Sequence, residues 1–279
     1  IETLDAWSGD LCKEVLGWSL LEEGLGPAHH AVRVVRSTTP NQSPPELMLN
    51  DALDILHRPY RLLVENAHSD GFFVFCMATP DERRFLEERV QREWLEIETC
   101  GGITGVTRRV KSLKRRHRDG LRLRCSAMFD CDAPAQGSPS DHAKTALQAC
   151  GQTIHHHMLT RRAIENYLPL PSLERWCGEK KGKEERERKA KMRAFSRLQP
   201  VQRHHFHMKD GLKKDNKPGA PASALWAALN ERDRGKLWDG FGSRIAELFE
   251  SDVHEDELKR DGGWHELRPF IEGLIARIR

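Results

Sequence analysis

Residues 121–132, LRLRCSAMFDCD, decide the fold expected for this chain. An apolar run of this length, bounded by turn-forming residues, is typical of a buried strand. Because residues i and i+2 of a strand point to the same face, we expect Asp130 and Asp132 to present their carboxylates side by side. Two adjacent carboxylates repel each other unless a cation lies between them.

Oxygen ligands at the end of a strand favour a hard divalent cation, which here means Mg²⁺ or Mn²⁺. The same Asp-x-Asp sequence, followed by Ala133 and Pro134, also fits an ordinary solvated turn. The pair by itself leaves both interpretations open.

Three further segments have the composition of strands, and helical patterns lie between them. The strands are expected at residues 60–65, 95–99 and 152–159, in addition to the central one. Connections of this length suit parallel pairing, so the order β-α-β-α-β-α-β predicts an α/β fold with a Rossmann-like parallel sheet. One helix start is well defined, since Thr79 is a good N-cap, Pro80 suits the first helical position and Glu82 completes a capping box.

Charged side chains follow the predicted strands at the edge where parallel sheets build their sites. Glu65 ends the first strand, the Gly101-Gly102 pair follows the second, and the two aspartates follow the third. After the fourth strand come Arg161, Arg162 and Glu165. We therefore expect an acidic metal site at this edge. Ser69 or Asp70 is expected to cap a helix that contains residues 72–77.

The flanking segments are expected to be mainly helical. We predict a helical N-terminal segment over 1–57, an α/β core over 58–170 and an α-rich extension over 171–279. Within them, helices are expected at 1–26, 46–57 and 264–278. The charge-dense segment 178–197 is interpreted as an exposed helix or a mobile segment.

Composition limits the classes of function. The net charge is only +3, but residues 108–124 carry nine Lys and Arg against one Asp, which suits a phosphate backbone as well as a solvated helix face. Seven cysteines without a CxxC pair favour reduced thiols and a cytoplasmic location. No run of about 18 apolar residues predicts a membrane span. At most two histidines of the run 155–157 can share one strand face, which disfavours a zinc site.

Four motifs together resemble a known family. They are LLVEN-x-x-SDGFF at 62–73, the glycine pair at 101–102, MFDCD at 128–132 and HMLTRRAIENYL at 157–168. In this combination they are similar to the TOPRIM domain, and more narrowly to the TOPRIM nucleases of the overcoming-lysogenization-defect (OLD) family and related anti-phage effectors. The resemblance covers roughly residues 58–170 and implies a Mg²⁺-dependent nuclease.

The resemblance also implies roles for individual residues. Glu65 matches the family's glutamate, Asp130 and Asp132 match its Asp-x-Asp pair, and Arg162 and Glu165 match its Arg-x-x-Glu element. The remaining matches are Asp70, as a further metal ligand beside Glu65 and the aspartate pair, and Lys209, as the basic residue near the scissile phosphate. Glu65 then acts as general base or as metal ligand.

Two positions depart from the family pattern. Asn66 stands where the family has glycine, and Asp70 lies five residues beyond Glu65 instead of four. They motivate an alternative, a catalytically degenerate subunit that binds nucleic acid or a partner. Because no GxxxxGK[ST] motif occurs, any nucleotide motor must be another chain. The resemblance implies a separate ABC-type ATPase as a partner. The helical flanks are expected to form the docking surface for this ATPase or for a second copy of the chain in a homodimer. The substrate is DNA or RNA.

Overall fold

A computed structural model describes residues 33–38, 46–116, 123–179, 181–213, 215 and 222–278. Two compact units divide the chain: residues 58–273 form one, and the described residues before 58 and after 273 belong to the other. The sheet, its covering helices and the C-terminal helices up to residue 273 therefore share one unit.

The larger unit is built on a four-stranded sheet. Its strands are β3 (Tyr60–Val64), β4 (Leu95–Thr99), β5 (Cys125–Phe129) and β6 (His155–Met158). Their order is β4-β3-β5-β6, and every neighbouring pair is parallel. The predicted α/β fold with a parallel sheet is confirmed. All four strands were expected close to these positions, although β5 and β6 are shorter than their apolar patterns.

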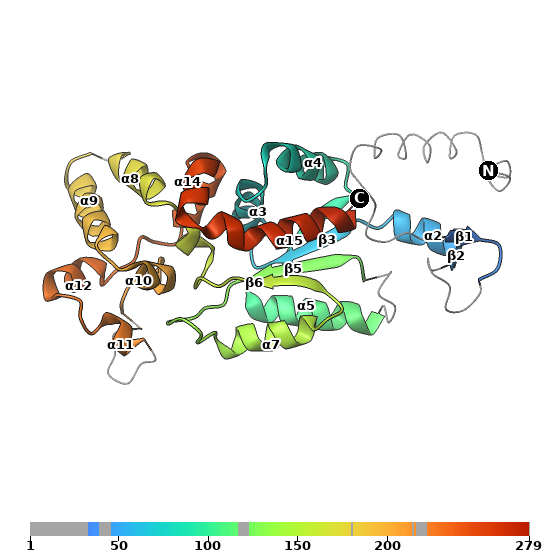
Figure 1. Cartoon of the computed structure of the whole chain (residues 1–279), viewed down its shortest axis with the longest axis horizontal. Helices are drawn as coiled ribbons and strands as arrows, with labels where there is room; N and C mark the ends of the chain where they lie inside the picture. Colours follow the sequence, from blue (N-terminus) through green and yellow to red (C-terminus); the bar gives the residue numbers. More distant parts are fainter. Residues whose placement is uncertain are drawn as a thin grey trace. The chain divides into compact units, whose positions relative to one another are not determined.

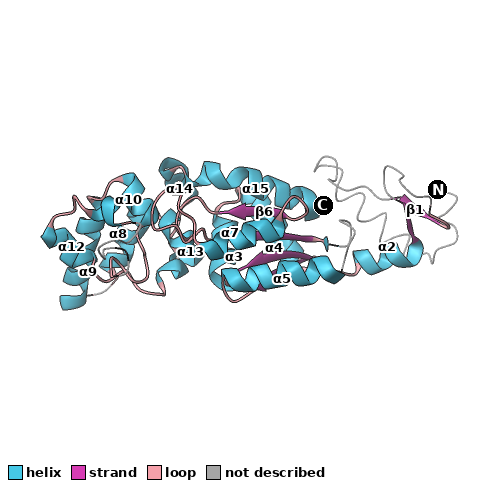
Figure 2. Ribbon diagram, turned by 90° about the horizontal axis from the view of Figure 1, so that it is seen from below, coloured by secondary structure: helices cyan, strands magenta, loops and turns pink. Residues whose placement is uncertain are grey.

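Helices cover both faces of the sheet (Figures 1 and 2). One face carries α5 (Ile103–Arg116) and α7 (Asp141–Cys150), whose apolar side chains form a buried core with β5. The other face carries α3 (Ala67–Cys76), α4 (Pro80–Gln91) and α15 (Gly263–Ile278). Parallel strands buried on both faces explain why Leu62, Leu63 and Val64 are fully buried.

Local signals set several helix boundaries. At α4 the predicted capping box is present: Thr79 Oγ1 accepts from the Glu82 N–H, and the Glu82 carboxylate accepts from the Thr79 N–H. Helix α3 begins earlier than expected, because Asn66 Oδ1 accepts from the His68 N–H and makes Asn66 the N-cap. The expectation that Ser69 or Asp70 caps this helix is wrong.

The chain after β6 is helical. A 3₁₀ turn, η2 (Ile164–Tyr167), leads into α8 (Leu170–Gly178), α9 (Lys183–Ser196), α10 (Pro200–His205), α11 (Ser223–Trp226), α12 (Glu231–Leu237), η3 (Ile245–Glu247), α13 (Leu248–Ser251) and α14 (Glu255–Asp261). Aromatic rings pack between these helices, with Phe206 in contact with Phe195, Trp226 and Phe241. Residues 183–196, within the charge-dense segment, form a helix that buries Met192 and Phe195. The helix is therefore exposed on one face only.

In the other unit, β1 (Arg33–Val35) pairs in parallel with β2 (Glu46–Met48), which continues into α2 (Leu49–Leu56). The expected helix over 46–57 is therefore wrong for its first three residues, which the pairing with β1 holds extended. The helix expected at 1–26 lies outside the described residues. Among the helices that the structure describes, none is both long and apolar enough to cross a membrane.

Candidate active site

Glu65 and Asp130 meet at the carboxyl edge of the sheet. Glu65 follows β3, Asp130 follows the neighbouring strand β5, and Glu65 Oε1 accepts a hydrogen bond from the Asp130 N–H at 3.0 Å. A cavity of about 160 Å³ opens beside them. Its lining includes Glu65, Asp70, Asp130, Glu165 and Lys209, together with Asn66, His68, Ser69, Ile164, Ser243, Ala246 and Glu247.

Glu165 and Lys209 reach the same cavity from later parts of the chain. The η2 turn is tied to the sheet edge because the Ile164 N–H donates to Asp130 Oδ1 at 3.2 Å. The next residue, Glu165, is only 2% exposed, and its Oε1 lies 3.0 Å from the Lys209 ammonium. The cavity is thus lined by one lysine and five carboxylates, those of Glu65, Asp70, Asp130, Glu165 and Glu247.

Two glycines allow the turn that carries Lys209 to fit. The Phe241 N–H donates to Met208 O at 2.6 Å, which brings the backbones of the two segments into contact. A Cβ at Gly240 would overlap the backbone of Lys209. Gly211 has φ +73°, and a Cβ there would overlap the carbonyl of Leu237. The close approach of these two segments therefore depends on glycine.

Three carboxylates of the cavity, those of Glu65, Asp70 and Asp130, have raised pKa values. Burial raises the pKa of Glu65 to about 7, and the charges of Asp70 and Asp132 add to this effect, whereas the Asp130 N–H and Lys209 oppose it. The pKa of Asp130 is raised well above its usual range, first by burial and then by Glu65 and Glu165. Burial alone lowers the pKa of Lys209, but the surrounding carboxylates outweigh burial and raise it. The cavity thus carries excess negative charge that one lysine balances incompletely.

Asp70 positions the backbone of Glu65. Its Oδ2 accepts from the N–H groups of Glu65 at 2.9 Å and Asn66 at 3.0 Å, and its Oδ1 accepts from Ser69 Oγ at 3.0 Å. Both oxygens are thus occupied by the chain itself. Asp70 lines the cavity, but these bonds hold the β3–α3 connection instead of leaving a free metal ligand.

Asp132 lies apart from the cavity lining. Strand β5 ends at Phe129, so Asp130 and Asp132 follow the strand and the same-face argument does not apply to them. Asp132 has φ 49°, and its side chain is exposed. Its N–H donates to Arg162 O at 2.9 Å. The expectation of two carboxylates side by side on a strand is wrong, although the charge of Asp132 still raises the pKa of Glu65.

Arg162 also points elsewhere. Its guanidinium forms an ion pair with Asp215 and donates to the carbonyl of His205. It does not line the cavity. The neighbouring Arg161 is paired with Asp261 and lies over the ring of Tyr167. Both arginines hold the segment after β6 against the C-terminal helices.

Residues 108–116 of the basic run lie on α5, whereas Arg124 immediately precedes β5. This helix starts at the carboxyl edge and runs back along the sheet, so its last turn is remote from the cavity (Figure 1). Arg109 pairs with Glu98, and the Lys114 ammonium donates to the last carbonyls of α7, at Ala149 and Cys150. Part of this charge is therefore used inside the fold.

A magnesium ion fits the donor chemistry of the cavity. Among the described residues, no three His, Cys, Asp or Glu side chains are already arranged as a metal cage. Mg²⁺ needs no such cage, since it is commonly held by one or two carboxylates, waters and substrate phosphates. No described residue donates a hydrogen bond to Glu65 Oε2 or Asp130 Oδ2, so each keeps a free oxygen.

The histidine run is fully partnered. His155 bonds Ser126 Oγ at 2.9 Å, His156 bonds Ile154 O, and His157 bonds Glu266. His155 also stacks on Phe270 of α15, with ring centroids 4.9 Å apart. His155 and His157 therefore fasten α15 to the edge strand.

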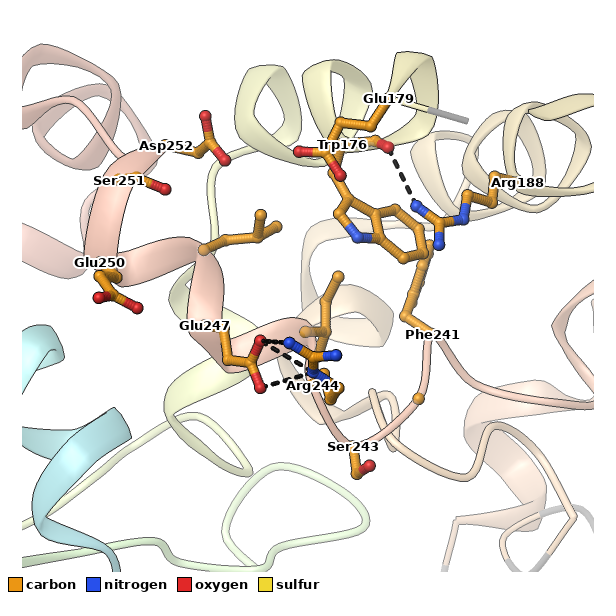
Figure 3. Close-up of a pocket in the computed structure, with 13 residues that line it drawn as sticks. Trp176, Glu179, Arg188, Phe241, Ser243, Arg244, Glu247, Glu250, Ser251 and Asp252 are labelled. Carbon is orange, nitrogen blue, oxygen red and sulfur yellow. Dashed lines mark hydrogen bonds and ion pairs between the residues drawn. The ribbon is translucent and has the colours of Figure 1, made fainter. Parts of the chain in front are cut away.

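A second, larger cavity of about 580 Å³ adjoins the first (Figure 3). Both are lined by Ser243 and Glu247. None of the residues predicted to carry the chemistry lines the larger cavity. The Gly-Phe-Gly at 240–242 contributes Phe241 and Gly242 to its wall.

Comparisons with models of protein families, with curated proteins and with solved structures find no match for this chain.

Proposed function

We propose that this chain is a Mg²⁺-dependent TOPRIM nuclease of the OLD type, which hydrolyses phosphodiester bonds in nucleic acid. The observation that supports this most is the meeting of Glu65, Asp130, Glu165 and Lys209 in one cavity at the carboxyl edge. These residues come from four separate segments, and two of the carboxylates have raised pKa values. Clustered perturbed groups of this kind are typical of functional sites.

Glu65 and Asp130 would hold the ion through their free oxygens. When bound, the ion would lower the pKa of a coordinated water molecule and neutralise negative charge on the phosphate. Before the ion binds, Glu65 has a pKa of about 7, so it would release its proton at neutral pH on becoming a ligand. Lys209 places its positive charge beside the phosphate, and Glu165 fixes the ammonium there. Asp70 acts indirectly, because it holds the backbone that carries Glu65.

The partners are proposed on the sequence resemblance alone. They are a DNA or RNA substrate, a separate ABC-type ATPase that controls the activity and, in the cell, a role in anti-phage defence. Co-purification with the ATPase, together with the mass of the complex in solution, tests the partner directly.

The decisive experiment measures cleavage of plasmid DNA, single strands and structured RNA with Mg²⁺, with Mn²⁺ and with a chelator. The assay is run with and without the ATPase, and we expect any cleavage in either case to require the cation. Replacing Lys209 by Met is expected to lower the cleavage rate by about 10²-fold, because a charge beside the phosphate is lost. Lys213 is the matched control: it belongs to the same turn region but pairs with Asp239 at the surface.

Cleavage that persists in the chelator would contradict the proposal, as would equal effects of the two lysine changes. Cation-independent binding of nucleic acid without any cleavage would favour the alternative, a degenerate subunit. The occupied oxygens of Asp70 and the exposed position of Asp132 are the observations on its side.

A further inference from the structure

The larger cavity has one aromatic wall, formed by α8 and α9. Trp176 is partly exposed there, and the Arg188 guanidinium lies 3.8 Å from its ring centroid while donating to the Trp176 carbonyl at 3.2 Å (Figure 3). Phe241 contacts the indole edge-on, at 6.0 Å between centroids. The indole is therefore held before any ligand arrives, which lowers the entropic cost of stacking against it.

The opposite wall is rich in hydrogen-bond acceptors. Glu250 and Asp252 line it, and Glu247 is engaged by Arg244 (Figure 3). In the described part of the chain, no side chain donates to the carboxylate of Asp252. With Glu179, four carboxylates face two guanidinium groups, and one of these is already paired with Glu247. A wall of this charge repels phosphate and attracts groups that donate hydrogen bonds.

The position of the cavity matters as much as its lining. It shares Ser243 and Glu247 with the carboxylate cavity, so a ligand there lies next to the proposed site of cleavage. Its volume of about 580 Å³ is in the range of small-molecule sites. A flat ring system that stacks on Trp176 and donates to carboxylates satisfies both walls.

We propose that this cavity binds an unpaired nucleobase carrying an exocyclic amino group, adjacent to the phosphodiester at the carboxylate cavity. The inference rests on the proposed nuclease function, because it assumes nucleic acid at the neighbouring site. Cytosine and adenine present an amino donor, whereas thymine presents only carbonyl acceptors and a ring N–H on its pairing edge. A base inside the cavity has left any duplex, so the substrate is single-stranded or locally opened.

The test is equilibrium binding of hexamers of deoxycytidine and deoxythymidine to the Asp130→Asn protein in chelator, where no cleavage occurs. We expect the deoxycytidine hexamer to bind about tenfold more tightly. Trp176→Leu is expected to weaken its binding by roughly tenfold, and Trp176→Phe by much less. Asp252→Asn is expected to narrow the preference, because an amide can also donate to thymine. Trp238→Leu is the control, since Trp238 is 43% exposed and lies outside the cavity lining.

Equal affinity for the two hexamers would overturn the inference, as would unchanged binding by folded Trp176→Leu protein or no measurable binding of either hexamer. This readout is independent of cleavage. A wild-type protein that shows the base preference but no cation-dependent cleavage would contradict the nuclease proposal and keep the base site. Cleavage without the base preference would do the reverse.

Discussion

Two glutamates of the larger unit have opposite surroundings. Glu65, at the carboxyl edge, accepts one backbone hydrogen bond and lies among carboxylates, and burial raises its pKa to about 7. Glu266, on α15, is also removed from solvent, which by itself raises its pKa. Hydrogen bonds from His157, Thr160 and Tyr167 outweigh burial and lower the pKa to about 2.

The difference lies in what the fold supplies to each carboxylate. The Glu266 oxygens receive the Thr160 N–H at 2.8 Å, the Thr160 hydroxyl at 2.5 Å and the Tyr167 hydroxyl at 2.7 Å. Its charge is satisfied, and it ties α15 to the segment after β6. Glu65 and Asp130 each keep an oxygen without a donor from the described residues. A buried carboxylate that the protein leaves unsatisfied is prepared for a proton or a cation, whereas a satisfied one serves the structure.

The largest effect expected is on catalysis. Asp130→Asn removes a buried charge with little change of shape, so we expect cation-dependent cleavage to fall by about 10²-fold or more. We expect thermal stability in chelator to stay equal or rise, because repulsion with Glu65 and Glu165 falls. Initial cleavage rates and thermal unfolding measure the two quantities. Wild-type cleavage by this variant would remove Asp130 from the site.

Glu266→Gln should behave in the opposite way. Four donor groups, from His157, Thr160 and Tyr167, lose a charged acceptor. We therefore expect the free energy of unfolding to fall by about 2–3 kcal/mol, as measured by urea denaturation. The control is Glu272→Gln on the same helix, where the carboxylate is 65% exposed and pairs with Arg268 at the surface. Equal stability of the two variants would show that the Glu266 contacts contribute little.

The pH dependence of stability separates the two glutamates further. An unfolded glutamate titrates near pH 4.5, whereas folded Glu65 titrates near 7, so its contribution to stability is present below pH 4.5 and is lost as the pH rises through 7. We expect a loss of about 1–2 kcal/mol in chelator between pH 5 and 8, allowing for partial exposure. Urea denaturation across this range measures it.

Two comparisons check the assignment of that slope. Glu65→Gln should show a smaller loss, with the remainder due to Asp130, whose pKa is also raised. Mg²⁺ should reduce the loss in the wild-type protein, because a bound cation favours the ionised form. The pH dependence that Glu266 contributes has the opposite sign. Its contribution to stability is present above pH 4.5 and is lost as the pH falls through about 2. A loss of the same size in Glu65→Gln and in the wild-type protein would assign the titration to another group.

The smallest effect is expected from the basic end of α5. Arg115 and Arg116 lie about 20 Å along the helix from its start at the carboxyl edge, beyond the screening length of physiological salt. Changing both to Ser should alter the cleavage rate of a short oligonucleotide by less than about twofold. A tenfold loss would show that the substrate reaches the far end of the sheet.

Much of the fold could be predicted from local patterns. The capping box at Thr79 sets the start of α4. The parallel sheet follows from the alternation of strands and helices, because each connection is long enough for a crossover. The placement of Glu65 and Asp130 at one edge follows from the same topology.

The roles of Asp70, Asp132 and Arg162 could not be predicted. Each depends on a partner or a backbone angle that the local sequence does not specify: the N–H groups of the β3–α3 connection, a φ of 49° after the end of β5, and Asp215. The sequence motifs predicted that all three belong to the site. The contacts of Asp70 and Arg162 assign these two residues to structural roles.

The sequence alone determined the α/β fold, the parallel strands and the edge where Glu65 and Asp130 lie, since hydrophobic period and caps act over a few residues. Only the tertiary structure decided that Lys209 stands against Glu165, through the backbone contact at Gly240, and that Glu266 is satisfied while Glu65 is not. The physical reason is that burial and hydrogen bonding of a charge depend on segments far apart in the chain, which no local pattern records.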